Sequence, residues 1–283
     1  MLINIIFMKL LISIAFYFTA DTTDRFKYLF KVVDNFIDEY KIDFTLNIDT
    51  NTDIVIPILN KKYEKYITDN KITITIHDES KMNHPYELTE KHRYLFLENI
   101  DNYDYFMYIE DDILVPYNSF TEYLVKFNEL YYDFGCVPGF VRLEEREGIY
   151  FHTDSDKINF RKREHVFIIK GRKYFKPDNP YHGFWILPKD VLKEKIKETA
   201  NNSNFIFEEG VFKIYDGMSR ENMAAYTSFQ LKLETLIELD ENIKVHKNCY
   251  CYHLPNNYVK KITSICCGLA ASVPINIMML IVD

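Results

Sequence analysis

The first 130 residues alternate short apolar runs with amphipathic helical patterns, and this alternation limits the possible folds more than any other feature. The apolar runs are rich in Ile, Leu, Phe and Tyr, as buried strands are. Strand–helix–strand alternation predicts parallel pairing with right-handed crossovers. We therefore predict an α/β fold with a mostly parallel central sheet. The expected strands span residues 10–17, 42–48, 72–76 and 105–109, and the expected helices span 22–40, 85–100 and 120–130.

The rest of the chain has a less regular pattern. Residues 142–179 are charged around a short apolar run at 166–169, which is typical of hairpins or a mobile insertion. The charge runs that begin at Glu144 and Arg161 are expected to be solvated faces. Beyond them we expect a strand at 184–187 and helices at 188–197 and 223–238.

Both ends of the chain allow two interpretations. Residues 10–18 resemble the apolar core of a signal peptide, but the sparse basic flank favours a buried first strand. Residues 262–282 carry no charge and are long enough to span a membrane at ~20 residues. Small and polar residues lower the hydrophobicity of this tail, so a segment packed on the domain is an equal alternative. We expect a cytoplasmic protein, with membrane association through 262–282 as an option.

Composition excludes several function classes. The 283 residues are 47% hydrophobic, which is too apolar for a disordered chain. There are 34 Lys and Arg against 42 Asp and Glu, a net charge of -8, which disfavours a general nucleic-acid binder. The five cysteines form no CxxC pair, so we expect free thiols rather than a zinc ribbon.

Polar clusters follow each expected strand of the first half, and they contain the candidate chemistry. Ligands of open parallel sheets bind beyond the carboxyl ends of the strands, so these clusters should line one crevice. The strongest is Glu110-Asp111-Asp112, where adjacent carboxylates repel one another unless a cation neutralises them. Hard oxygen ligands suit Mg²⁺ or Mn²⁺, and such ions commonly complete their shells with substrate phosphate. Solvent-exposed acids at a helix start are the alternative. The clusters are 19–24, 49–51, 77–78 and 110–112.

The segment from Tyr105 to Asp112, followed by Pro116 and Phe120, resembles the metal-binding segment of GT-A fold glycosyltransferases. The resemblance spans roughly 10–259 and is strongest at 88–124 and 181–259. It implies a GT-A-like, Rossmann-type α/β/α sandwich. One domain is then expected at 8–260, with a nucleotide-binding half at about 8–125 and an acceptor half at about 126–260. The tail at 261–283 has no counterpart, and the Gln-x-x-Arg-Trp motif of processive synthases is absent.

The same resemblance implies a reaction and a site. The reaction is hexosyl or N-acetylhexosaminyl transfer from a nucleoside-diphosphate sugar to a hydroxyl of a glycan, lipid or protein, with Mn²⁺ or Mg²⁺. Asp112 and His253 would bind the metal, with Glu110 and Asp111 near the ribose or behind the metal ligands. His182 and Gly183 match a segment that contacts donor and acceptor.

Further residues are candidates for roles in the reaction that the resemblance implies. Arg93 suits a diphosphate or base contact, with an ion pair to Glu90 or Glu98 as the alternative. Asn51 could contact the uracil or ribose, or simply form a turn. An inverting enzyme needs a base, for which Glu221 is the first candidate and Asp216 and Asp190 the weaker ones.

Two other functions remain open at this stage. A metal-dependent nucleotidyltransferase would share the acidic cluster, but residues 19–24 lack the Gly and Lys of a triphosphate loop. A non-catalytic sugar-nucleotide-binding protein would tolerate loss of Asp112, Glu221 or His253, and all three are present.

Overall fold

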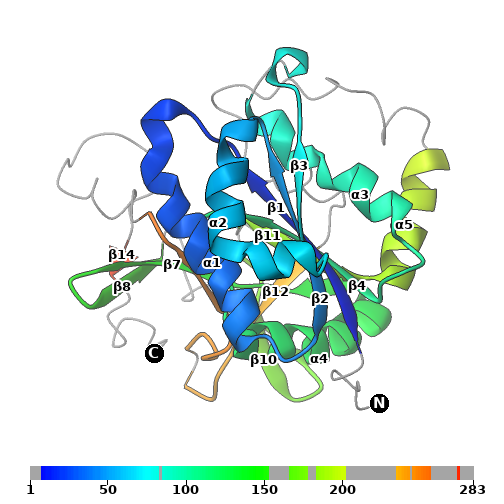
Figure 1. Cartoon of the computed structure of the whole chain (residues 1–283). Coiled ribbons are helices and arrows are strands. Elements are labelled where there is room, and N and C mark those ends of the chain that lie inside the picture. Colours follow the sequence, from blue (N-terminus) through cyan, green and yellow to red (C-terminus); the bar gives the residue numbers. More distant parts are fainter. Residues whose placement is uncertain are drawn as a thin grey trace. The chain divides into compact units, whose positions relative to one another are not determined.

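Figure 1 shows the helices and strands of a computed structural model of the chain. The chain divides into two compact units, each built from separate stretches of sequence. Unit 1 draws on residues 1–30, 41–111 and 183–231, and unit 2 on 31–40, 112–182 and 232–283. The chain thus leaves unit 1 at Asp111 and enters unit 2 at Asp112. The described residues are 8–82, 85–152, 166–177, 183–201, 234–242, 244–255 and 273–274. His182, Asp216 and Glu221 lie outside them.

Unit 1 is built on a five-stranded sheet in the order β11-β4-β1-β2-β3. The first four strands along the chain are parallel, and β11 is antiparallel to β4. The order β3-β2-β1-β4 is that of a Rossmann-type sheet. This topology confirms the predicted α/β class and mostly parallel central sheet. The strands are β1 (Lys9–Phe16), β2 (Asp43–Thr50), β3 (Ile72–Ile76), β4 (Tyr105–Glu110) and β11 (Phe184–Pro188).

The central position of β1 explains its composition. Every residue from Leu10 to Phe16 is buried, as expected for a strand covered on both faces. The interpretation of residues 10–17 as a buried strand is therefore confirmed.

Helices connect these strands. A 3-10 helix at Ala20–Arg25 leads into α1 (Phe26–Glu39), in agreement with the helix expected at 22–40. α2 (Ile56–Thr68) lies between β2 and β3 and was not predicted. The helix expected at 85–100 is a 3-10 helix at Pro85–Glu90 followed by α3 (His92–Glu98). α5 (Lys189–Asn201) follows β11, where a helix was expected.

Aromatic rings fix α3 on the sheet. Phe96 contacts the Phe106 ring of β4 at 5.3 Å and the Trp185 ring of β11 at 5.6 Å between centroids. The ring centroids of His92 and Tyr108, which lies on β4, are 4.7 Å apart. These contacts hold β4 in place up to its acidic end.

Unit 2 contains two smaller sheets and α4 (Tyr117–Phe134). The first sheet has the order β6-β12-β10-β9 and the second β14-β8-β7-β13-β5. The β7–β8 and β9–β10 hairpins agree with the hairpins expected between 142 and 179. The strands are β5 (Ile113–Leu114), β6 (Cys136–Pro138), β7 (Val141–Arg146), β8 (Ile149–His152), β9 (Val166–Ile169), β10 (Arg172–Phe175), β12 (Glu234–Leu239), β13 (Tyr250–His253) and β14 (Val273–Pro274).

Two expectations are wrong within unit 2. The helix predicted at 223–238 is wrong over its last five residues, because β12 is a strand paired with β6 and β10. Residues 223–233 lie outside the described part. Glu144 is fully buried on β7, beside buried Arg142, and not on a solvated face.

The remaining expectations concern cysteines and membranes. Cys136, Cys249 and Cys251 are buried free thiols, as predicted for these three. Within the described residues, no helix has the length and apolar character needed to cross a bilayer.

Candidate functional site

Polar side chains meet at the carboxyl ends of the unit 1 strands. Asp49, at the end of β2, accepts a hydrogen bond from the Ser13 hydroxyl of β1 at 2.5 Å. Its other oxygen lies 2.8 Å from Nε2 of His77, which follows β3. Ser13 and Asp49 are almost completely buried. Hydrogen bonds thus join two of the four predicted clusters, 49–51 and 77–78, and Asn51 also reaches Phe18, just before the cluster at 19–24.

Asn51 ties this loop to the end of β2. Its Oδ1 accepts from the backbone N–H of Phe18 at 2.8 Å, and its Nδ2 donates to the carbonyl of Phe18 at 2.9 Å and to Glu79 at 3.1 Å. Glu79 also accepts a hydrogen bond from the Tyr17 hydroxyl. The Asn51 amide thus positions the loop with both of its polar groups.

Asp111 is neutralised by an arginine of the same unit. The Arg25 guanidinium binds both of its carboxylate oxygens, with Nε at 2.9 Å from Oδ2. The Asp111 side chain is 3% exposed and that of Arg25 36%. A bidentate pair of this kind fixes the orientation of both groups.

The other unit 1 candidates have defined positions. The backbone N–H of Glu110 donates to the carbonyl of Gly183 at 2.9 Å, so these two predicted residues lie together. Gly183 has φ of 79°, a backbone angle that favours glycine. Arg93 is buried on α3 and pairs with Glu90 at 3.4 Å, the alternative considered for it, although inside the protein and not on its surface.

In unit 2, the structure brings Asp112 and His253 together, as the resemblance implied. His253 ends β13, which pairs antiparallel with β5 immediately after Asp112. Nε2 of His253 lies 3.6 Å from Oδ2 of Asp112. The backbone N–H of Leu254 also donates to the carbonyl of Asp112 at 2.9 Å. The antiparallel pairing of β5 and β13 therefore fixes both side chains.

Glu144 completes this arrangement. Its Oε1 lies 2.5 Å from Nδ1 of His253, and the residue is fully buried. Burial alone would lower the pKa of His253, but the hydrogen bonds with Asp112 and Glu144 outweigh it and raise that pKa to about 8. The imidazole thus lies between two carboxylates and is held by one of them.

This arrangement fits a divalent metal site. A metal-bound histidine usually donates its second ring N–H to a carboxylate, which fixes the ring and makes the ligand more basic. Glu144 occupies that place on Nδ1, while Nε2 faces the Asp112 carboxylate. Asp112 and His253 are therefore the residues that would hold Mn²⁺ or Mg²⁺, with Glu144 behind His253.

Sequence reasoning missed Arg25 and Glu144. Arg25 lies 86 residues before its partner, and only its place in the polar loop after the first strand indicated that it could reach the strand ends. Glu144 lies within a run of charged residues, 109 positions before His253, and nothing in the sequence indicated that the two side chains are in contact.

Comparisons with known proteins found only distant structural similarity. No protein-family model matches the sequence, and no curated protein matches it. The similar solved structures include those of S. aureus TarS 1-349 alone (12% identity, TM-score 0.45) and in complex with UDP (13% identity, TM-score 0.40). Each match covers 90% of this chain and 63% of the other, so the chain spans less than two thirds of that protein. At these values the likeness carries no information about substrate or reaction.

Proposed function

We propose that this protein is a metal-dependent glycosyltransferase that moves a sugar from a nucleoside diphosphate to a hydroxyl. The observation that carries the proposal is the Asp112–His253–Glu144 arrangement directly after β4. It supplies one carboxylate and one oriented imidazole, and both are buried. A divalent ion with so few protein ligands keeps open positions for water and for diphosphate oxygens.

The metal would stabilise the negative charge that develops on the leaving diphosphate when its bond to the anomeric carbon breaks. Asp112 and His253 would hold it, and Glu144 would keep Nε2 of His253 directed toward it. The chain has a net charge of -8 and the proposed donor is also anionic. A metal cation between the protein carboxylates and the diphosphate would offset their repulsion.

The strand ends of unit 1 are proposed to bind the nucleoside. Asp49, His77 and Asp111 present hydrogen-bonding groups there, and Arg25 holds Asp111 in one orientation. Asn51 is proposed to support nucleoside binding by holding the loop after β1 in position. Arg93 is proposed as a diphosphate contact. Its guanidinium also forms an ion pair with Glu90.

The proposed acceptor-binding residues are inferred from the sequence. Glu221 is proposed as the base that takes the acceptor proton in an inverting reaction, and His182 and Gly183 as donor or acceptor contacts. Asp190, a weaker candidate base, lies in the first turn of α5, where an acid also interacts favourably with the helix dipole.

The test is nucleotide release from a panel of UDP-, GDP- and CMP-sugars in the presence of Mn²⁺ and candidate hydroxyl acceptors. Release from at least one donor is expected, and Asp112→Asn should lower it by about 100-fold or more. Asp133→Asn, which changes an exposed carboxylate paired with Lys170, is the matched control and should leave the rate unchanged.

Three outcomes would contradict the proposal. Metal-dependent donor binding without turnover would identify a sugar-nucleotide-binding protein. Diphosphate release from a nucleoside triphosphate would identify a nucleotidyltransferase. No response to any donor, with Asp112→Asn equal to wild type in binding, would exclude both the site and the reaction.

A further inference from the structure

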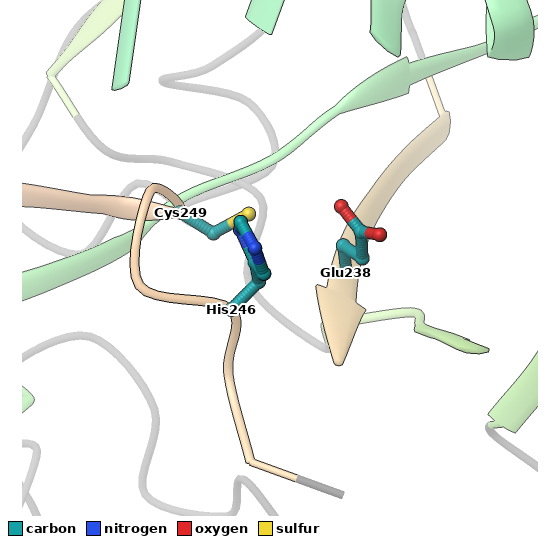
Figure 2. Close-up of side chains that lie close together, drawn as sticks. All are labelled: Glu238, His246 and Cys249. Carbon is teal, nitrogen blue, oxygen red and sulfur yellow. The ribbon is translucent and has the colours of Figure 1, made fainter. Parts of the chain in front are cut away.

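A second group of ligand-type side chains lies in unit 2, and the proposed reaction makes no use of it. Glu238, His246 and Cys249 point toward one another, as Figure 2 shows. One potential ligand atom from each, a carboxylate oxygen, a ring nitrogen and the sulfur, lies within 4.8 Å of the other two.

Two consecutive turns bring these residues together. The chain turns after β12, where Asp240 Oδ1 accepts from the backbone N–H groups of Asn242 and Lys244, each at 2.8 Å. It then returns beside β12, so that the N–H of His246 donates to the carbonyl of Glu238 at 2.9 Å.

The second turn is a tight one over residues 246–249. The backbone N–H of Cys249 donates to the carbonyl of His246 at 2.8 Å. The carbonyl of Cys249 then accepts from the N–H of Val141, which fixes Cys249 at the start of β13. All three side chains are therefore held by backbone hydrogen bonds on neighbouring segments.

The surroundings suit a soft divalent ion. Cys249 and Glu238 are buried, and Cys249 belongs to an apolar cluster with Val245, Ile237 and Leu239. His246 is half-buried, which gives an ion a path from solvent. Nδ1 of His246 accepts a long hydrogen bond of 3.4 Å from the N–H of Asn248, so a metal ion bound at Nδ1 would replace that bond.

We propose that Glu238, His246 and Cys249 form a zinc site. Zn²⁺ takes thiolate, imidazole and carboxylate ligands in tetrahedral geometry, at about 2.0–2.3 Å from the metal. Ligand atoms around one zinc ion are then about 3.4–3.6 Å apart. The observed limit of 4.8 Å therefore requires pairs of ligand atoms to approach by at most about 1.2–1.4 Å, within the reach of side-chain rotations.

Two basic side chains lie beside Glu238, and their positive charges affect whether a metal ion can bind to this carboxylate. Lys126 Nζ lies 2.5 Å from Oε2 of Glu238, and Arg172 Nη1 lies 3.7 Å from Oε1. These cations orient the carboxylate as partners behind a metal ligand commonly do. A thiolate and a carboxylate balance the two charges of Zn²⁺, and Glu122, 3.5 Å from Lys126, then remains as the partner of that lysine.

The zinc ion would link the turn at 246–249 to β12, and a water molecule would take the fourth position. Because the three ligands lie within twelve residues, the site would stabilise one local loop of unit 2. Nothing in this assignment depends on the donor site, whose proposed metal ligands are Asp112 and His253.

The test is titration of the metal-depleted full-length chain with Co²⁺, followed by optical absorption, and then with Zn²⁺. Wild type is expected to bind Co²⁺ with a thiolate-to-metal charge-transfer band, which Zn²⁺ abolishes on displacing Co²⁺. Cys249→Ser should lose the band. His246→Gln, at a half-buried position where unfolding is a smaller risk, should weaken Co²⁺ binding about 10-fold or more.

Two controls identify the site. Cys251→Ser removes a buried thiol two residues away and should keep the band. Asp112→Asn, at the proposed donor metal site, should keep it as well. Absence of a thiolate band in wild type, or its persistence in folded Cys249→Ser, would overturn the proposal and leave Glu238 as an ion-pair partner of Lys126 and Arg172.

Discussion

At the residue scale, adjacent acids acquire different partners: the resemblance implied His253 for Asp112, whereas nothing in the sequence indicated Arg25 for Asp111. The position of Glu110-Asp111-Asp112 at a strand end was predictable, because an apolar run that breaks into three acids has a clear pattern. Asp111 pairs with Arg25, whereas Asp112 faces His253. Such partners lie 86 to 141 positions away along the chain, and only the fold brings them together.

The Arg25–Asp111 pair gives the first prediction. Arg25→Gln leaves a buried carboxylate without its bidentate partner and should lower the free energy of unfolding by about 1–3 kcal/mol. Arg25→Lys should recover only part of this, since an ammonium cannot form the two parallel bonds. Urea denaturation measures both. Lys27→Gln, which breaks an exposed pair with Asp24, is the control and should change little.

Tyr17 and Glu79 give a prediction about pH. Hydrogen bonds from the Tyr17 hydroxyl and the Asn51 amide lower the pKa of Glu79. A folded-state pKa below the unfolded one adds stability above the ordinary carboxyl range, and this stability is lost as the pH falls. Tyr17→Phe should therefore destabilise the protein more at neutral pH than at about pH 3.

Denaturation curves at the two pH values test this prediction. Tyr132→Phe, at an exposed position of α4, is the control and should show no such difference. An equal loss of stability at both pH values for Tyr17→Phe would show that Glu79 is not the titrating partner.

At the element scale, the local sequence pattern predicted the strands of the central sheet. It failed where pairing with strands distant in the sequence determines the structure. β1 and β4 could be predicted because their sequences are almost continuously apolar, and β2 and β3 because apolar and polar residues alternate along them. Residues 234–238 were expected to be helical, yet they belong to β12, which lies between β6 and β10, and the hydrogen bonds with these strands outweigh local spacing. α2 escaped prediction because its apolar positions are few among Lys, Asn and Tyr.

The pairing of β6 with β12 gives a third prediction. Gly139 donates to the carbonyl of Leu236, and a Cβ at this position would meet Cγ2 of Thr235. Gly139→Ala should therefore cost about 1–3 kcal/mol of unfolding free energy through overpacking. Adding Thr235→Ser, which removes Cγ2, should recover part of the loss in urea denaturation. Equal costs with and without Thr235→Ser would contradict the close approach.

At the scale of the whole molecule, composition and topology lead to the same requirement. The chain carries a net charge of -8, and its Rossmann-type sheet collects polar groups at the strand ends. The donor in the proposed function is anionic, and at such an acidic site it would bind through an intervening cation. We therefore expect nucleoside diphosphate binding to be lost on removal of divalent metal with EDTA, as calorimetry would measure.

The central claim is that Asp112, His253 and Glu144 form a metal site for a diphosphate. The most direct measurement is the affinity for Mn²⁺ in the presence of UDP, GDP or CDP, compared between wild type, Asp112→Asn, Glu144→Gln and Asp133→Asn. We predict that Glu144→Gln weakens Mn²⁺ binding about 10- to 100-fold, that Asp112→Asn weakens it further, and that Asp133→Asn has no effect. Equal Mn²⁺ affinity in all four proteins would contradict the account.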